Sequence, residues 1–161
     1  MSTDTTICRS VRRHGEWSTA HSRIALTWDE RFLRRRRLTA ADGSAFHLDL
    51  PETTSLDDGD ALQLDDGRLI AVEAAPEPLL EVRGDLARLA WHIGNRHTPC
   101  RIEAGRLLIR NDHVLRDMLV RLGAQVREIS VPFSPEGGAY GHGRTLPHDQ
   151  GHGRHEHGQH A

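Results

Sequence analysis

Histidines crowd the last twenty residues of the chain, from His142 to Ala161. Six of the twelve histidines lie there, separated by glycines and polar residues. Neutral imidazole is the most common protein ligand for borderline transition metals. We therefore expect this segment to bind metal ions through His142, His148, His152, His155, His157 and His160.

The composition of this histidine-rich tail predicts that it stays disordered. Apart from its histidines it consists mostly of Gly, Arg, Gln, Asp and Pro, so it cannot bury apolar surface. A flexible row of imidazoles captures metal ions and can release them. An expression tag is the alternative explanation, but the histidines are scattered rather than continuous, which favours a metal-capturing segment.

Two histidines outside the tail, His97 and His113, are further candidate metal ligands. His97 follows Gly94-Asn95-Arg96, where a short loop after a predicted helix would expose its imidazole. His113 stands at the predicted start of a second helix, whose dipole disfavours a protonated imidazole. For His97 an ordinary exposed loop residue is an equally weighted alternative, and His92 is better explained as a plain helix residue. An isologous dimer would bring together two copies of one exposed histidine and so strengthen such a site.

No catalytic constellation is recognisable in the sequence. It contains no His-Glu-x-x-His motif, no phosphate-binding loop and no Gly-x-Ser-x-Gly. The glutamate flanked by histidines, Glu156, lies in the tail, which cannot hold a catalytic base rigidly. The two cysteines, Cys8 and Cys100, are far apart and indicate neither a disulfide framework nor a thiolate zinc site. We expect a protein of the reducing cytoplasm that is not an enzyme.

The charge pattern has one conspicuous feature, the run Arg34–Arg37. The formal net charge of the chain is −2, so there is no general polyanion-binding surface. Alternation along a strand would point two of these arginines to each face, which suits an edge strand exposed on both sides. The run could dock an acidic protein surface or form a nucleic-acid patch, and four arginines do not decide between them. No apolar run approaches the roughly 20 residues that span a bilayer, so we expect no membrane segment.

The first half of the chain predicts a small all-β domain. Residues 1–20 are polar and aperiodic and are expected to form a loose extension. From 21 to 75, short apolar runs alternate with Asp-Gly pairs, which suit tight hairpin turns. These runs predict a small barrel or sandwich of five strands: Arg23–Trp28, Arg31–Leu38, Ala45–Leu50, Ala61–Leu64 and Arg68–Ala74.

Residues 76–140 predict a second domain of mixed α+β class, followed by the tail at 141–161. The expected order is βαββαβ, the ferredoxin-like unit. RNA binding through this sheet is disfavoured, because its expected strands Leu79–Arg83 and Arg106–Arg110 carry no aromatic residue for stacking. The remaining expected elements are a helix capped by Asp85 and ended by Gly94, a strand Pro99–Glu103, a helix capped by Asn111 or Asp112 and ended by Gly123, and a strand Gln125–Phe133.

Several motifs of this second domain resemble the UreE family of urease accessory proteins. They are Trp91–His97 (WHIGNRH), Asp112–Leu119 (DHVLRDML), Leu122-Gly123, Pro132–Tyr140 (PFSPEGGAY) and the histidine-rich end. The ordered motifs cover about a third of the chain and occur in the family's order. The resemblance implies a nickel-binding metallochaperone that captures Ni(II) and delivers it to the urease apoprotein during active-site assembly.

The resemblance also implies an arrangement and a set of partners. Two-domain subunits would form a homodimer with His97 as the nickel ligand at its interface, and the tail histidines would complete or feed that site. The β-rich domain would engage the urease apoprotein complex and its accessory proteins, including the UreG GTPase. Some relatives carry a further histidine where this chain has Asn111, so His113 is either a weak ligand or structural. Because imidazole suits both ions, Zn(II) is the other candidate cargo, and general buffering or storage of transition metals is the alternative function.

Overall fold

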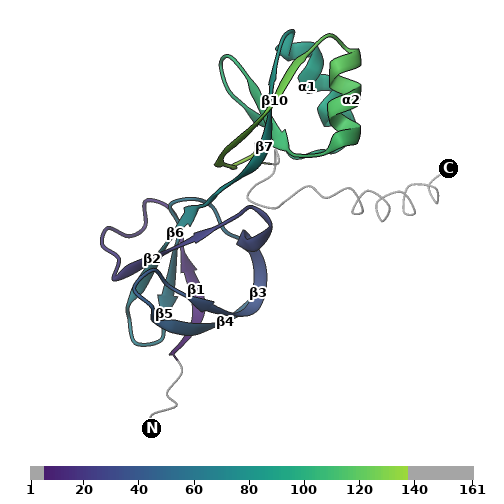
Figure 1. The fold of residues 1–161 in the computed structure, drawn as a ribbon. Helices are drawn as coiled ribbons and strands as arrows, with labels where there is room; N and C mark the ends of the chain where they lie inside the picture. The colour runs from purple at the N-terminus through teal and green to yellow at the C-terminus, as the bar shows by residue number, and fades with distance from the viewer. Residues whose placement is uncertain (1–5, 138–161) are drawn as a thin grey trace, which may run out of the picture. The chain divides into compact units, whose positions relative to one another are not determined.

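The computed structural model describes residues 6–137, which fall into two compact units (Figure 1). The first unit is Met1–Pro76 and the second is Glu77–Ala161. The division lies one residue from the boundary that the sequence predicts between residues 75 and 76. The expected disordered tail and its six histidines lie outside the described residues.

The first unit is a six-stranded sheet with the strand order β2-β6-β5-β1-β4-β3. Five of its strands lie where the sequence predicts strands. A turn of 3-10 helix, Asp29–Arg31, precedes β3. The core is built from buried side chains of every strand, among them Cys8, Ile24, Leu38, Phe46, Leu62 and Ile70. The strands are β1 (Thr6–Arg12), β2 (Ser22–Leu26), β3 (Phe32–Thr39), β4 (Ala45–Ser55), β5 (Ala61–Leu64) and β6 (Leu69–Ala74).

Strand β1 corrects the prediction that residues 1–20 form a loose extension. It lies inside the sheet, parallel to β4 on one side and antiparallel to β5 on the other. Cys8 is fully buried at 0% exposure, whereas Arg9 and Ser10 are exposed. A bulge between Cys8 and Ser10 shifts the register. The bulge breaks the alternation of apolar and polar residues, which is the signal that reveals a strand in a sequence.

The three Asp-Gly pairs form the tight turns that the sequence predicts. Gly43, Gly59 and Gly67 have φ values of 91°, 95° and 94°. This left-handed conformation is open to glycine without steric strain. A β-carbon at Gly59 would also meet the imidazole of His14, an exposed side chain that would have to shift.

The second unit packs two helices on one face of a four-stranded sheet (Figure 1). The strand order is β10-β7-β9-β8, and the chain order βαββαβ is the predicted one. The Asp85 side chain caps α1 by accepting from the Arg88 N–H, and Asp112 rather than Asn111 caps α2. Figure 1 labels β7 (Pro76–Arg83), α1 (Leu86–Asn95), α2 (His113–Arg121) and β10 (Gln125–Pro132), while β8 (Arg101–Ile102) and β9 (Leu107–Arg110) form the hairpin.

A buried carboxylate organises the face of this sheet that the helices leave uncovered. Leu80 and Val82 point into the core beneath the helices, so alternation places Glu81 on the opposite face. Glu81 is only 2% exposed, and its two oxygens accept hydrogen bonds from three arginines. The donors are Arg127 Nε at 2.7 Å, Arg106 Nη1 at 2.8 Å and Arg83 Nε at 3.1 Å. These bonds, led by the one from Arg127, lower the pKa of Glu81 to about 2.

Replacing Glu81 with glutamine is expected to lower the free energy of unfolding by about 1–3 kcal/mol, because it removes charge-assisted bonds from a buried site. The folded pKa lies below the ordinary glutamate value. The carboxylate therefore stabilises the fold at neutral pH, and this contribution is lost as the pH falls toward about 2. Urea denaturation at pH 7 and pH 3 measures both effects. The exposed Glu52→Gln is the control with the same change of charge, and an equal loss in the two variants would contradict the assignment.

Candidate metal site

His97 has an unusual backbone conformation at the end of helix α1. Its φ is 58°, the only positive value at a non-glycine residue between positions 6 and 137. Its side chain is exposed, as the sequence predicts. The prediction that Gly94 forms the left-handed cap is wrong, because Gly94 lies inside α1 and the helix continues to Asn95. The residue that turns the chain out of the helix is therefore the candidate metal ligand itself.

Two backbone hydrogen bonds fix the conformation of His97. The His97 N–H donates to the Gly94 carbonyl at 2.9 Å, and the Thr98 N–H donates to the Ile93 carbonyl at 3.4 Å. This pair of bonds is the Schellman motif, in which the left-handed position is usually occupied by glycine. The chain obeys that preference at the end of α2, where Gly123 has φ 91° and donates to the Val120 carbonyl at 3.0 Å.

The two helix ends differ in the residue that occupies the left-handed position, which is histidine after α1 and glycine after α2. Histidine enters the left-handed region more readily than most residues, but glycine does so without a steric penalty. A non-glycine residue held there costs on the order of 1 kcal/mol. Departures from local preference of this kind concentrate at functional positions. The backbone at His97 thus departs from the local preference for glycine, which makes His97 a candidate functional residue.

His113 and His92 have more ordinary surroundings. His113 is the exposed first residue of α2, directly after the capping residue Asp112. The Asp112 carboxylate accepts from the N–H groups of Val114 at 2.9 Å and Leu115 at 3.1 Å, so it is engaged by the helix start. His92 is half-buried and makes an edge-to-face contact with the Trp91 ring, with 5.0 Å between the centroids. That contact fits the interpretation of His92 as a plain helix residue.

One chain does not bring a complete ligand set together within the part that the structure describes. Among residues 6–137 there is no group of three or more His, Cys, Asp or Glu side chains that could hold a metal ion. His97 and His113 thus belong to no such group. Burial raises the pKa of both Cys8 and Cys100 to about 11, so neither thiol is a thiolate at neutral pH in the metal-free chain.

The helices beside His97 carry large apolar side chains on their outer surface. Trp91 is 65% exposed and Val114 is 53% exposed. Arg96, next to His97, links the two helices through its Nε, which lies 3.1 Å from the Met118 sulfur. Exposed apolar side chains that form a contiguous patch mark protein-binding surfaces, and Trp91 and Val114 are candidates for such a patch. The sequence could have revealed these two exposed residues, because helical spacing places Trp91 and Val114 outside the buried stripes of α1 and α2.

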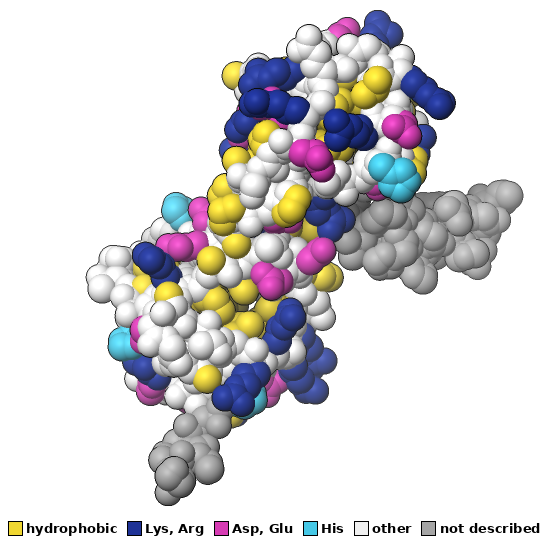
Figure 2. Space-filling model, viewed as in Figure 1, with side chains coloured by type: hydrophobic (Ala, Val, Ile, Leu, Met, Phe, Trp, Pro, Cys, Tyr) yellow, Lys and Arg dark blue, Asp and Glu magenta, His cyan; other side chains and the backbone are white. Residues whose placement is uncertain are grey.

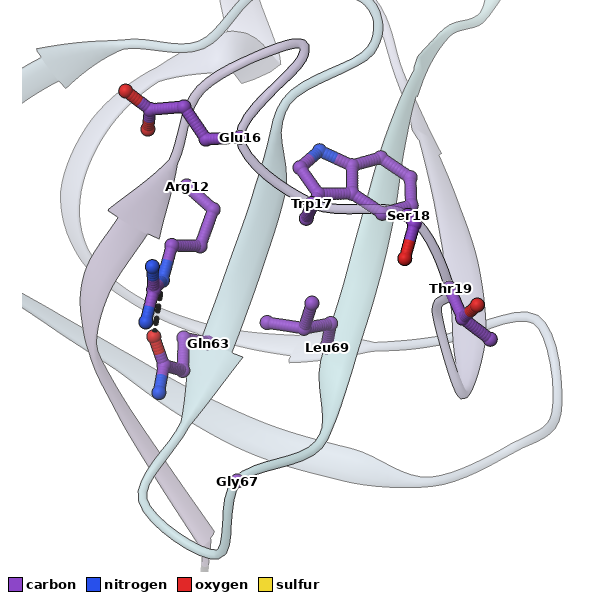
Figure 3. Close-up of a pocket in the computed structure, with 8 residues that line it drawn as sticks. All are labelled: Arg12, Glu16, Trp17, Ser18, Thr19, Gln63, Gly67 and Leu69. Carbon is purple, nitrogen blue, oxygen red and sulfur yellow. Dashed lines mark hydrogen bonds between the residues drawn. The ribbon is translucent and has the colours of Figure 1, made fainter.

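The first unit contains an open hollow of about 330 Å³ (Figure 3). In Figure 3 the Arg12 side chain lies beside Gln63, whose oxygen accepts from Arg12 Nε at 2.7 Å. None of the lining side chains is a histidine or a cysteine, so the hollow offers no soft metal ligands. Its lining is Arg12, Glu16, Trp17, Ser18, Thr19, Gln63, Gly67 and Leu69.

Neither helix of the described part is long and apolar enough to cross a membrane.

Two family models together match almost the whole chain. The model described as the UreE urease accessory protein N-terminal domain matches residues 5–75, and that of the C-terminal domain matches residues 73–160.

Individual relatives agree with the family models. A protein of Ruegeria pomeroyi named "Urease accessory protein UreE" is 62% identical over 146 residues, which cover 90% of this chain and 98% of the relative. Proteins of the same name from Rhodobacter capsulatus and Paracoccus denitrificans are 61% and 64% identical. They cover 85% and 76% of this chain, and 88% and 79% of their own lengths. The chain therefore belongs to the UreE family of urease accessory proteins, which are chaperones of urease maturation and not enzymes.

Proposed function

We propose that this chain is a nickel metallochaperone, which captures Ni(II) and delivers it to the urease apoprotein while the urease active site is assembled. Membership of a urease accessory family supports this role. The observation that carries it is His97, an exposed imidazole held in a left-handed cap where glycine would be less strained. Nickel is the ion that this function requires, and imidazole nitrogen is a suitable ligand for it.

The metal site is completed by a second copy of the chain. A two-fold axis beside α1 and α2 would place two His97 imidazoles together and cover Trp91 and Val114. The order of strands in the second unit, β10-β7-β9-β8, supports a ferredoxin-like fold for each subunit of this homodimer. The tail histidines from His142 to His160 supply further ligands, and His113 contributes weakly if at all. Zn(II) competes for the same site.

Delivery requires contact with the urease apoprotein complex and with its accessory proteins, including the UreG GTPase. The β-rich first unit serves the contact with the apoprotein, and the second unit holds the metal. We place this work in the cytoplasm, where the free thiols of Cys8 and Cys100 stay reduced.

Calorimetric titration of the full chain with Ni(II) and with Zn(II) tests the site. We expect one tight Ni(II) ion per two chains, followed by weaker binding of further ions, because the interface holds its ligands in place before the ion arrives. Sedimentation of the metal-free chain should show a dimer. A tight ion bound by each chain as a monomer would contradict the shared site.

A further inference from the structure

Strand β3 forms an open edge of the first sheet and carries the run Arg34–Arg37. It stands at the end of the strand order and pairs along its length with β4, while just past its end the Ala41 N–H donates to the Arg23 carbonyl of β2 at 2.7 Å. All four arginines are exposed, whereas Leu33 and Leu38 on either side of them are buried. Figure 2 shows arginine side chains gathered on the surface of this unit. Because the formal net charge of the chain is −2, this density of positive charge is local to the edge.

The four arginines differ in whether their guanidinium groups already have hydrogen-bond partners within the protein. Arg34 Nε donates to the Leu50 carbonyl at 3.1 Å, where the register between β3 and β4 shifts. Arg35 Nε donates to the Asp49 carboxylate at 3.1 Å. The guanidinium groups of Arg36 and Arg37 make no hydrogen bond or ion pair with any residue between 6 and 137. Two cations on this edge thus remain available to a ligand.

The backbone of the same segment directs some of its hydrogen-bonding groups away from β4. The Ala40 N–H donates to the Ser44 carbonyl at 2.9 Å, which makes Ala40 and Ser44 a hydrogen-bonded pair of the antiparallel ladder. Such pairs recur at every second residue, so Arg36 bonds to its partner Leu48 in β4. The N–H and C=O groups of Arg35 and Arg37 must then point away from β4 toward the open edge.

We propose that the open edge of β3 binds an extended, acidic segment of a partner protein as an additional strand. The backbone groups of Arg35 and Arg37 would pair with that segment, as in other cases of strand addition. The side chains of these two residues lie on the face that carries His47 and Asp49, and Arg36 lies on the face that carries Leu48. Carboxylates on either face of the incoming strand therefore meet a guanidinium group.

Two further properties of the chain fit an acidic strand. The sequence contains no lysine, so every cation on this edge is a guanidinium fork that can hold a carboxylate by two parallel bonds. The same charges repel the β3 edge of a second copy, which keeps the edge open for a different partner. The outward N–H and C=O groups of Arg35 and Arg37 have the spacing of a β-strand and can pair with a peptide backbone, whereas a nucleic acid would contact only the arginine side chains. This docking surface goes beyond the proposed function and does not require bound metal.

The charge requirement is tested with a labelled ten-residue peptide of alternating Glu and Val, by fluorescence anisotropy at low salt. Replacing Arg36 and Arg37 with glutamine in the full chain should weaken its binding by about tenfold, because two exposed guanidinium–carboxylate pairs are lost. The control replaces Arg12 and Arg23, two exposed arginines on other strands, and should leave the affinity within about twofold. Equal weakening in both double variants would overturn the assignment to this edge.

The strand-addition requirement is tested by comparing Arg37→Pro with Arg37→Gln. Both lose the same charge, but proline also removes the N–H that points to the open edge and leaves the ladder to β4 intact. The proline variant should bind the peptide about tenfold more weakly than the glutamine variant. A peptide methylated on alternate backbone nitrogens should likewise lose binding to the unmodified chain, and this arm stands even if the proline variant unfolds.

Two outcomes would overturn the proposal. If the methylated peptide binds as well as the parent peptide, the edge does not act by strand addition. If a single-stranded oligouridylate of equal charge binds more tightly than the peptide and loses that affinity in the Arg36/Arg37 variant, the surface recognises nucleic acid instead.

Discussion

Replacing His97 with glycine is expected to weaken the tightest Ni(II) binding by about 100-fold or more. Removal of a hydrogen-bond partner behind a ligand already costs 10–100-fold in metal affinity, and this change removes the ligand itself from both subunits. The same change should raise the free energy of unfolding by about 0.5–1 kcal/mol, because glycine adopts φ 58° without strain. If the variant binds nickel more weakly and is nevertheless more stable, His97 is needed for metal binding and not for the fold.

Competition with a nickel chelator measures the affinity, and urea denaturation of the metal-free chain measures the stability. His97→Asn is a useful companion, because asparagine tolerates the left-handed conformation but is a poor nickel ligand. His47→Gln removes an exposed histidine from β4 and serves as the control. Unchanged nickel affinity in the glycine and asparagine variants would remove His97 from the site.

Deleting residues 142–161 is expected to lower the number of Ni(II) ions bound at saturation and to leave the tightest event in place. Six of the twelve histidines leave with this segment, while His97 and both folded units remain. A chain with these six histidines replaced by glutamine has the full length and should behave like the deletion, because imidazole supplies the ligands.

Equilibrium dialysis with nickel counts the bound ions in the three proteins. If the deleted form bound no nickel, the tail would be the primary site. If it bound as many ions as the full chain, the tail would have no role in capture.

The sequence predicts the larger elements of this fold because their signals are local. Alternating apolar residues mark β4 and the Asp-Gly pairs mark its turns, so five strands of the first unit lie where they are expected. The stripe of Leu86, Leu89 and Ile93 marks α1, and Asp85 marks its beginning. Strand β1 escaped prediction because its bulge interrupts the alternation at Cys8, and only the pairing with β4 and β5 reveals it.

The features that the sequence did not reveal depend on contacts between distant residues. Gly94 looks like a helix cap, yet α1 runs through it, and the left-handed position falls on His97 instead. The three arginines around Glu81 come from β7, β10 and the hairpin, so their spacing in the sequence does not indicate that they meet. The proposed metal site is still harder to predict, because residues 6–137 of one chain do not hold a complete ligand set.

Activation of urease apoprotein by the nickel-loaded chain tests the central claim most directly. An excess of a chelator that captures free nickel, but does not strip it from the loaded chain, should be present, so that free nickel cannot activate the enzyme. We predict that the loaded chain restores urease activity under these conditions and that the His97→Gly variant loaded with the same nickel does not. If an unrelated histidine-rich peptide of matched nickel affinity activates urease equally well, the chain acts as a metal buffer and the proposal of directed delivery is contradicted.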